Sequence, residues 1–318
     1  MDVVIAQTVD AASLALVRGM LPDVECRDPI APGEDVPDCR VLFTDGPPAN
    51  VADLPSLEWI QLGSAGFRQL AGLGLPTRVR VTNASGVNDI PIAEWCVLMM
   101  LSLTRDLPAQ LADRAARRYE RPPVYQAELR GRRVGIFGFG SIGREVARVC
   151  GALGLEVWAL SRGGPARPRF TAVDVAPDRL FGPGDLREFL AGLDFLVLTA
   201  PLTDETQGRF GATELGWLPR HAMLLNPARA HLVDEAALLS ALRAGTIAGA
   251  ALDVHYREPL PPDDPFWTAP RTILTPHVSG STGSTHFVSR LWALFAENVR
   301  RFTAGEPLLN EIARHEIA

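Results

Sequence analysis

Short apolar segments alternate with helical segments along almost the whole chain. Four strand-like stretches occupy the first third, and six more follow from Arg132 onward. They are VVIA, RVLFTDG, LEWIQLGSAG and RVRVTNASG in the first series, then RRVGIFGFG, EVWALS, DFLVLTAP, AMLLNPA, GAALDV and TILTPHVSG in the second. Near-continuous apolar strands that alternate with helices form parallel sheets covered on both faces. The sequence therefore predicts an α/β fold with two doubly wound parallel-sheet domains.

Three of the remaining segments carry helical signatures. In IGREVARVCGAL, residues 142–153, the apolar residues fall on one helical face. In DEAALLSALRAG, Asp234 is a suitable N-cap and Gly245 a suitable C-terminal stop. Residues 287–302 predict a long final helix. This helix could pack on the first domain, an arrangement that the sequence alone does not establish.

Composition excludes several classes of protein. The 318 residues suffice for two domains, and a net charge of −6 argues against a general binder of nucleic acid or anionic membranes. The longest apolar run, residues 92–103, is interrupted and too short to span a bilayer. The N-terminal residues lack a secretory signal pattern, and the four cysteines lack C-x-x-C spacing. A cytoplasmic protein with reduced thiols and no metal site is expected.

A glycine-rich loop indicates a phosphate-binding site. Gly138, Gly140 and Gly143 stand in G-x-G-x-x-G spacing, after a predicted strand and before a predicted helix. In this motif the first glycine permits a tight turn, the second lets the backbone approach a pyrophosphate, and the third lets helix and strand pack closely. The string alone is a weak signal, but its position between strand and helix favours a dinucleotide site.

The next strand ends in an unusual pair. An acidic residue commonly stands about 20 residues after the glycine motif and holds the ribose hydroxyls. Here Ser161 and Arg162 take that place, 18 and 19 residues after Gly143. A carboxylate would repel the 2′-phosphate of NADP, whereas a hydroxyl and a guanidinium donate hydrogen bonds to it. The pair therefore predicts a preference for NADP(H), with NAD(H) as the alternative if Arg162 merely faces solvent.

Three later strand ends carry polar side chains. Arg229 follows LLNPA, Glu258 follows DVHYR, and His277 lies in TPHVSG. Ligands of open α/β sheets bind outside the carboxyl ends of the strands, so these side chains are expected to converge. A carboxylate favours a protonated imidazole and orients it, and arginine holds a carboxylate at two points. Each residue alone is more typical of a turn or a solvated charge, and it is their joint placement that favours catalysis.

Several motifs, in this order, resemble those of one known family. From LEWIQLGSAG to the last helix, the chain is similar to the D-isomer-specific 2-hydroxyacid dehydrogenases, which include glyoxylate/hydroxypyruvate reductases, D-lactate dehydrogenases and phosphoglycerate dehydrogenases. The matching motifs are VTNASGVNDIPIAEW, GIFGFGSIGREVAR, APLTDETQGRF, LLNPARAHLVDEAAL, GAALDVHYREPLP and TPHVSGST.

The resemblance implies an architecture and a set of site residues. A Rossmann dinucleotide-binding domain, residues 100–285, is expected to be inserted into a flavodoxin-like substrate-binding domain, residues 1–99 and 286–318. The catalytic set maps to Arg229, Glu258 and His277, and the substrate carboxylate to Ser64, Ala65 and Gly66. Cofactor contacts are expected from Gly138, Gly140, Ser141, Ile142, Gly143, Ser161, Arg162, Pro201, Thr206, Asp253 and Gly280. The apolar segment 92–103 resembles the family's dimer-forming helix, so a homodimer is expected.

The implied activity is reduction of a small 2-keto acid to a D-2-hydroxy acid, with hydride from the nicotinamide and a proton from His277. The alternative is a dinucleotide-sensing interaction protein of the same fold with little turnover. Oxidation of formate or phosphite is a second rival, but the formate branch predicts glutamine at Glu258. Two departures bear on the site: Ala230 stands where the family usually has glycine, and His255-Tyr256 replaces a common aromatic–acidic pair.

Overall fold

The chain folds into two compact units, each described by itself. The computed structural model describes residues 2–7, 9–31, 33–119, 127–163, 169–170, 173–282 and 284–317, without the side chains of 68, 315 and 316. Unit 1 falls within residues 1–88, 165–172 and 282–318, and unit 2 within residues 89–164 and 173–281. Unit 2 is thus inserted into the sequence of unit 1.

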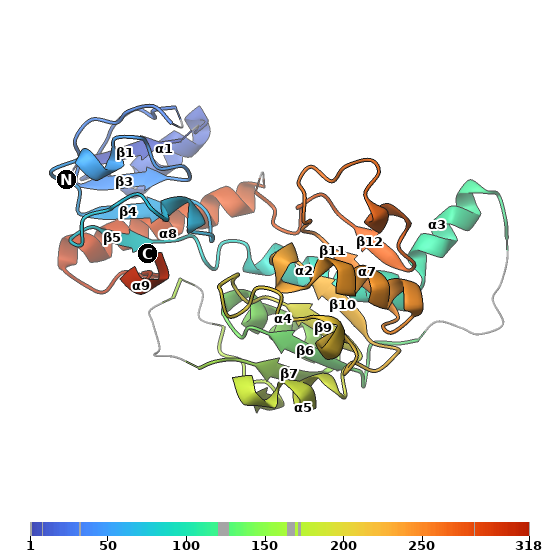
Figure 1. Ribbon diagram of the computed structural model, residues 1–318. Helices are drawn as coiled ribbons and strands as arrows, with labels where there is room; N and C mark the ends of the chain where they lie inside the picture. Colours follow the sequence, from blue (N-terminus) through green and yellow to red (C-terminus); the bar gives the residue numbers. More distant parts are fainter. Residues whose placement is uncertain are drawn as a thin grey trace. The chain divides into compact units, whose positions relative to one another are not determined.

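Unit 1 is built on a parallel sheet of order β2-β1-β3-β4-β5 in its described residues (Figure 1). Its strands are β1 (Asp2–Ala6), β2 (Glu25–Cys26), β3 (Val41–Thr44), β4 (Trp59–Leu62) and β5 (Arg80–Thr82). Its helices are α1 (Ala11–Met20), α8 (Thr285–Ala304) and α9 (Arg314–Ile317), with short 3-10 turns η1 (Val51–Asp53) and η2 (Arg68–Leu70). This strand order is the flavodoxin-like variant of the doubly wound fold.

Helix α8 joins the far end of the chain to unit 1. Its aromatic residues Trp292 and Phe295 pack on Phe43 of β3, with ring centroids 4.7 and 4.9 Å apart. Buried Asn298 donates a hydrogen bond to Gln61 of β4 over 3.0 Å and accepts one from the backbone of Leu309 over 2.7 Å. The final helix therefore does return to the first domain, because its apolar face completes that domain's core.

Unit 2 contains a parallel sheet of order β12-β11-β10-β9-β6-β7-β8 in its described residues. Its strands are β6 (Arg133–Phe137), β7 (Glu156–Leu160), β8 (Arg179–Phe181), β9 (Phe195–Leu198), β10 (Met223–Asn226), β11 (Gly249–Leu252) and β12 (Thr272–Leu274). Its helices are α2 (Asp89–Thr104), α3 (Leu107–Ala115), α4 (Ser141–Ala152), α5 (Leu186–Leu190), α6 (Ala212–Leu215) and α7 (Glu235–Ala244). Short 3-10 turns are η3 (Pro183–Asp185), η4 (Ala230–Leu232) and η5 (Pro265–Thr268).

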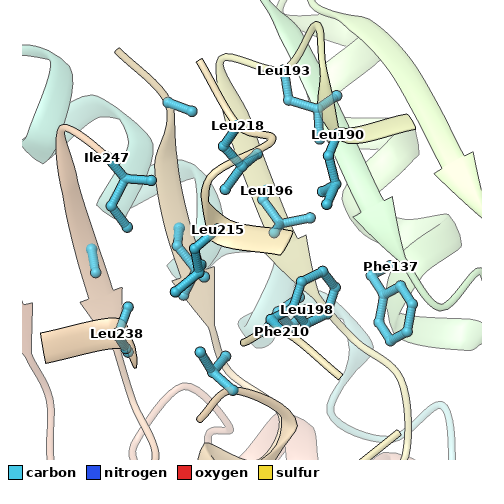
Figure 2. Packing of buried hydrophobic residues seen from close by; sticks show 14 of the residues in the cluster. Phe137, Leu190, Leu193, Leu196, Leu198, Phe210, Leu215, Leu218, Leu238 and Ile247 are labelled. Carbon is cyan, nitrogen blue, oxygen red and sulfur yellow. The ribbon is translucent and has the colours of Figure 1, made fainter. Parts of the chain in front are cut away.

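The strand order of the unit 2 sheet reverses between β6 and β9, as in a Rossmann sheet. In such sheets, dinucleotides bind at the point where the strand order reverses. Buried side chains cover both faces, as near-continuous apolar strands require. Helices α2 and α4 supply one face. On the other face Phe137, at the end of β6, meets Phe210 edge-on with ring centroids 4.9 Å apart (Figure 2). Figure 2 also shows the leucines of β9 and α6 that surround this contact.

The predicted strands and helices are confirmed. Asp234 caps α7 by accepting a hydrogen bond from Ala237 over 2.8 Å, and Gly245 ends the helix at φ +64°. The short strands β2 and β8 carry no apolar run and were not predicted. No helix in the described part of the chain is both long and apolar enough to cross a membrane.

The chain passes from unit 1 into unit 2 at 88/89 and back into unit 1 at 281/282, and residues 165–172 are also assigned to unit 1. The boundary expected at 99/100 therefore falls inside α2, whose buried face packs with α4, and the boundary expected at 285/286 falls at the start of α8. Which unit binds substrate and which binds dinucleotide stays a prediction.

Candidate active site

Three neighbouring strands of unit 2 end beside the expected catalytic residues. Arg229 follows β10, Glu258 follows β11 and His277 follows β12. These strands are adjacent and parallel, so their carboxyl ends share one edge of the sheet. The edge gathers residues that are up to 48 positions apart in the sequence.

His277 and Glu258 form a hydrogen-bonded pair. Nδ1 of His277 lies 3.0 Å from Oε2 of Glu258, and the two side chains are 52% and 40% exposed. The backbone amide of His255 donates to Oε1 of the same carboxylate over 2.9 Å. Burial raises the pKa of Glu258, but the hydrogen bonds from His277 and His255 outweigh burial and leave this pKa below its usual value.

These contacts assign the protons of the pair. An ionised carboxylate can only accept hydrogen bonds, so Nδ1 of His277 is the donor toward Glu258. Nε2 then remains for exchange with a ligand. The pair has the properties of a general acid held in a fixed orientation.

Asp253 holds the loop that carries His277. Its carboxylate is fully buried and accepts hydrogen bonds from the backbone amides of Val278 and Ser279, each over 2.8 Å, and from the Thr275 hydroxyl over 2.5 Å. His277 has φ +57°, a left-handed conformation that costs a non-glycine residue about 1–2 kcal/mol. The hydrogen bonds to Asp253 hold the residues on either side and so maintain this conformation.

Arg229 projects from a turn that Asn226 stabilises. The buried Asn226 side chain donates to the backbone carbonyl of Arg229 over 2.9 Å and accepts from the amide of Ala228 over 3.1 Å. Arg229 itself is exposed and donates to the carbonyl of Ala228 over 2.6 Å. Ala230 begins the 3-10 turn η4, a right-handed conformation open to any residue, so replacement of the family glycine imposes no backbone strain here.

The His255-Tyr256 departure also has a structural account. Nε2 of His255 lies 2.9 Å from the carbonyl of Thr275, which ties the loop after β11 to the loop after β12. The Tyr256 hydroxyl donates to the carbonyl of Val233 over 3.0 Å, and its ring stacks on Phe266. Both residues therefore support the loops that carry Glu258 and His277.

The glycine-rich loop packs closely against neighbouring backbone at Gly138 and Gly143. Gly138 has φ +100°, and a Cβ there would lie 2.6 Å from the backbone nitrogen of Ala200. A Cβ on Gly143 would lie 2.4 Å from the carbonyl oxygen of Gly138, which also accepts a hydrogen bond from Thr199 over 2.5 Å. Gly140 precedes the first residue of α4, Ser141, so the helix N-terminus opens at the loop. This arrangement fits the pyrophosphate of a dinucleotide.

The remaining expected cofactor residues lie at the same edge of unit 2. Ser161 and Arg162 follow β7, and Thr206 is a buried part of the turn after β9, where its hydroxyl donates to the carbonyl of Pro201 over 2.7 Å. Gly280 follows β12 and is half-buried. Arg162 donates to Glu205 over 2.7 Å. Gly164, which follows this pair, lies outside the described residues.

Ser64, Ala65 and Gly66 form a turn after β4 of unit 1. The Ser64 hydroxyl donates to the carbonyl of Gly66 over 3.0 Å, and the Asn83 side chain donates to the carbonyl of Ala65 over 2.8 Å. The turn is thus fixed by its own hydrogen bonds. Its contact with a substrate stays a prediction.

Sequence reasoning missed three supporting residues. Asn226, Thr275 and Glu205 each make a side-chain hydrogen bond that holds a loop or a charged group of the site. A polar residue at the end of an apolar strand was the only available signal for Asn226 and Thr275. Among the described residues, no three His, Cys, Asp or Glu side chains cluster as a metal ion requires.

Comparison with curated proteins assigns the chain to a family. The family model described as D-isomer specific 2-hydroxyacid dehydrogenase, NAD binding domain, matches residues 97–279. A glyoxylate reductase of Korarchaeum cryptofilum is 32% identical over 287 residues, which cover 86% of this chain and 82% of the relative. The chain spans only 41–43% of the length of several D-3-phosphoglycerate dehydrogenases that it also matches.

Solved structures agree in fold over the whole chain. A D-isomer specific 2-hydroxyacid dehydrogenase of Xanthobacter autotrophicus Py2, in complex with NADPH and MES, superposes with a TM-score of 0.84 at 30% identity and covers 100% of this chain and 99% of its own. An NADPH-dependent glyoxylate/hydroxypyruvate reductase of Sinorhizobium meliloti, in complex with NADP and sulfate, has a TM-score of 0.81 at 26% identity, with 98% of each chain covered. With the family model matching more than half of its residues, the chain belongs to the D-isomer specific 2-hydroxyacid dehydrogenase family.

Proposed function

We propose that this protein reduces small 2-keto acids of the glyoxylate or hydroxypyruvate type to D-2-hydroxy acids, with NADPH preferred over NADH. The observation that carries the proposal is the 3.0 Å hydrogen bond between His277 and Glu258, on the same sheet edge as Arg229. The named activities of the glyoxylate reductase relatives support the substrate class.

Arg229 is the proposed anchor for the substrate. Its guanidinium is exposed, and its planar fork matches a carboxylate at two points. The Asn226 turn fixes the backbone from which this side chain extends. Binding the carboxylate in this way orients the adjacent carbonyl, so Arg229 contributes to alignment as well as to affinity. The Ser64–Gly66 turn is proposed to contact the same carboxylate.

His277 is the proposed proton donor. A bound nicotinamide dinucleotide supplies the hydride, and residues 138–143 are proposed to hold its pyrophosphate. As the carbonyl carbon gains the hydride, Nε2 of His277 gives its proton to the carbonyl oxygen and the ring becomes neutral. Glu258 stabilises the charged ring beforehand and keeps it oriented, and solvent returns the proton afterwards.

Ser161 and Arg162 are the proposed determinants of the NADPH preference. Neither carries the negative charge that would repel a 2′-phosphate, and the guanidinium provides paired donors for one. The NADPH and NADP complexes of the Xanthobacter and Sinorhizobium proteins support this reading.

The test is a steady-state panel of glyoxylate, hydroxypyruvate, pyruvate and larger 2-keto acids, each with NADPH and NADH. The proposal expects the highest kcat/KM with a small keto acid and NADPH. It also expects D-configured products from hydroxypyruvate, pyruvate and the larger keto acids, whereas glyoxylate gives an achiral product. Dinucleotide binding without turnover on any keto acid would favour the sensing alternative. Turnover of formate or phosphite instead would show that the chain oxidises a different small anion and would contradict the proposed keto-acid reduction.

We also propose that the protein is a homodimer. Helix α2 is strongly apolar, and Glu94 is the charged residue on its exposed side. Its inner side packs in the core of unit 2, whereas Ile90, Leu98 and Leu101 are exposed. Leu107 and Leu111 of the adjacent α3 extend this apolar surface. A second copy of the same surface would cover it symmetrically.

A further inference from the structure

An ion pair connects the two loops on either side of the glycine-rich loop. Nη1 of Arg162, after β7, lies 2.7 Å from Oε2 of Glu205, after β9. Strands β7 and β9 are not neighbours, because β6 lies between them. The pair therefore reaches across the end of β6, where Gly138 begins the loop that fits a pyrophosphate.

Glu205 is held at this place by its own turn. The neighbouring Thr206 hydroxyl is buried, accepts from the amide of Thr203 over 2.8 Å and donates to the carbonyl of Pro201 over 2.7 Å. The backbone of the turn is thus fixed one residue from Glu205. Because the Arg162 and Glu205 side chains are 57% and 70% exposed, the ion pair is weak and can open.

The charges of this pair bear directly on cofactor choice. Glu205 places a carboxylate beside Arg162 and occupies the guanidinium that a 2′-phosphate would need. A phosphate monoester carries a charge of about −1.5 to −2 at neutral pH, so it is repelled by Glu205 as well as attracted by Arg162. A cofactor that lacks this phosphate experiences neither the repulsion by Glu205 nor the attraction by Arg162.

We propose that Glu205 is a specificity-determining residue that limits the preference for NADPH by competing with the 2′-phosphate for Arg162. This inference rests on the proposed function only in its assignment of Arg162 to the phosphate. It predicts that removing the Glu205 charge strengthens NADPH binding and leaves NADH binding almost unchanged. The preference of the parent protein is then smaller than Ser161 and Arg162 alone would produce.

The experiment measures binding rather than turnover. Dissociation constants for 2′,5′-ADP, 5′-AMP, NADPH and NADH are determined by calorimetry with the parent protein and Glu205→Gln. From the repulsion between the two charges at about 6 Å in water, 2′,5′-ADP and NADPH should bind about threefold to tenfold more tightly to the variant. The 5′-AMP and NADH constants should change less than about twofold, and raising the salt concentration should reduce the gain.

Two further variants separate competition from a general change in charge. Asp204→Asn removes the same charge one residue away, and Asp204 forms no ion pair with any residue in the described ranges, so its effect should be clearly smaller. In an Arg162→Ala background, Glu205→Gln should increase the affinity for 2′,5′-ADP less than it does in the parent, because no guanidinium is left for Glu205 to occupy.

Several results would overturn the inference. The first two are an equal increase in 2′,5′-ADP affinity from Asp204→Asn, and an equal increase from Glu205→Gln with and without Arg162. The others are an unchanged affinity of Glu205→Gln for 2′,5′-ADP, or a higher selectivity for NADPH that arises only from weaker NADH binding. The proposed function fails separately. If no keto acid is reduced but Glu205→Gln still tightens 2′,5′-ADP binding, the role of Glu205 stands and the reductase activity does not.

Discussion

Nδ1 of His277 donates a hydrogen bond to Oε2 of Glu258 over 3.0 Å, and the backbone amide of His255 fixes the other oxygen of the same carboxylate. The imidazole is thus oriented by a group that is itself held by the main chain. In the proposed mechanism His277 and Glu258 have separable roles, because His277 carries the proton and Glu258 orients the ring of His277.

His277→Ala should lower kcat by about two to four powers of ten, the usual contribution of a general acid. The dissociation constant of NADPH should change little, since the glycine-rich loop and Arg162 follow β6 and β7, whereas His277 follows β12. Stopped-flow and steady-state rates, with fluorescence titration of NADPH, check both statements. His221→Ala alters an exposed histidine that lies near Asp194 and serves as the control. Parental turnover of His277→Ala would remove this residue from the mechanism.

Glu258→Gln should lower kcat and shift the fall in rate at high pH to lower pH. The pKa of Glu258 is below its usual value, so the carboxylate is ionised at neutral pH. In general, a negative charge beside an imidazole favours the protonated form of the ring. Glutamine can keep a hydrogen bond but not the charge. A profile of kcat from pH 5 to pH 9 measures the shift. An unchanged profile with a lowered plateau would mean that Glu258 only orients the ring.

Arg229→Lys should lower kcat/KM for the keto acid by about tenfold or more. Lysine keeps the charge but lacks the planar fork that binds a carboxylate at two points. NADPH affinity should stay at the parental value. Arg243→Lys, an exposed position in the last turn of α7, provides the matched control. If Arg229→Lys retained the parental KM and kcat, the proposed carboxylate contact would be wrong.

Arg162→Ala should selectively lower the kcat/KM with NADPH. Hydrogen bonds to a charged group contribute about 1.5–3 kcal/mol, which corresponds to roughly 10-fold to 100-fold in kcat/KM. The kcat/KM with NADH should remain within about twofold of the parent, because NADH has no 2′-phosphate. Arg187→Ala, on the exposed side of α5, controls for loss of a positive charge. Equal losses with both cofactors would contradict the proposed phosphate contact.

Leu98→Arg should convert a dimer into a monomer. Leu98 is 54% exposed on α2 and belongs to the apolar surface that α2 and α3 present. A buried arginine without a partner strongly disfavours association. Light scattering after size-exclusion chromatography measures the mass, and Leu180→Arg tests an equally apolar exposed position on β8. A parent protein that is already monomeric, or a dimeric Leu98→Arg variant, would exclude α2 as the interface.

The sequence determined the elements whose stability is local or whose burial leaves a periodic pattern. Strand β9 is buried on both faces, so its whole length is apolar and visible in the sequence. The bounds of α7 follow from Asp234 and Gly245, because a cap and a left-handed stop involve residues only three or four positions apart. The glycine spacing predicted the loop after β6 for the same local reason.

Only the tertiary structure decided which distant groups meet. Strands β2 and β8 have two and three residues and no apolar run, so they exist because β1 and β7 offer them hydrogen-bonding partners. Asp253, which the sequence suggested as a cofactor contact, uses its carboxylate to hold the loop around His277. The Arg162–Glu205 pair joins residues 43 positions apart. Residue type and spacing cannot specify such contacts, because they depend on the order in which the strands assemble and on the backbone paths of the loops that follow them.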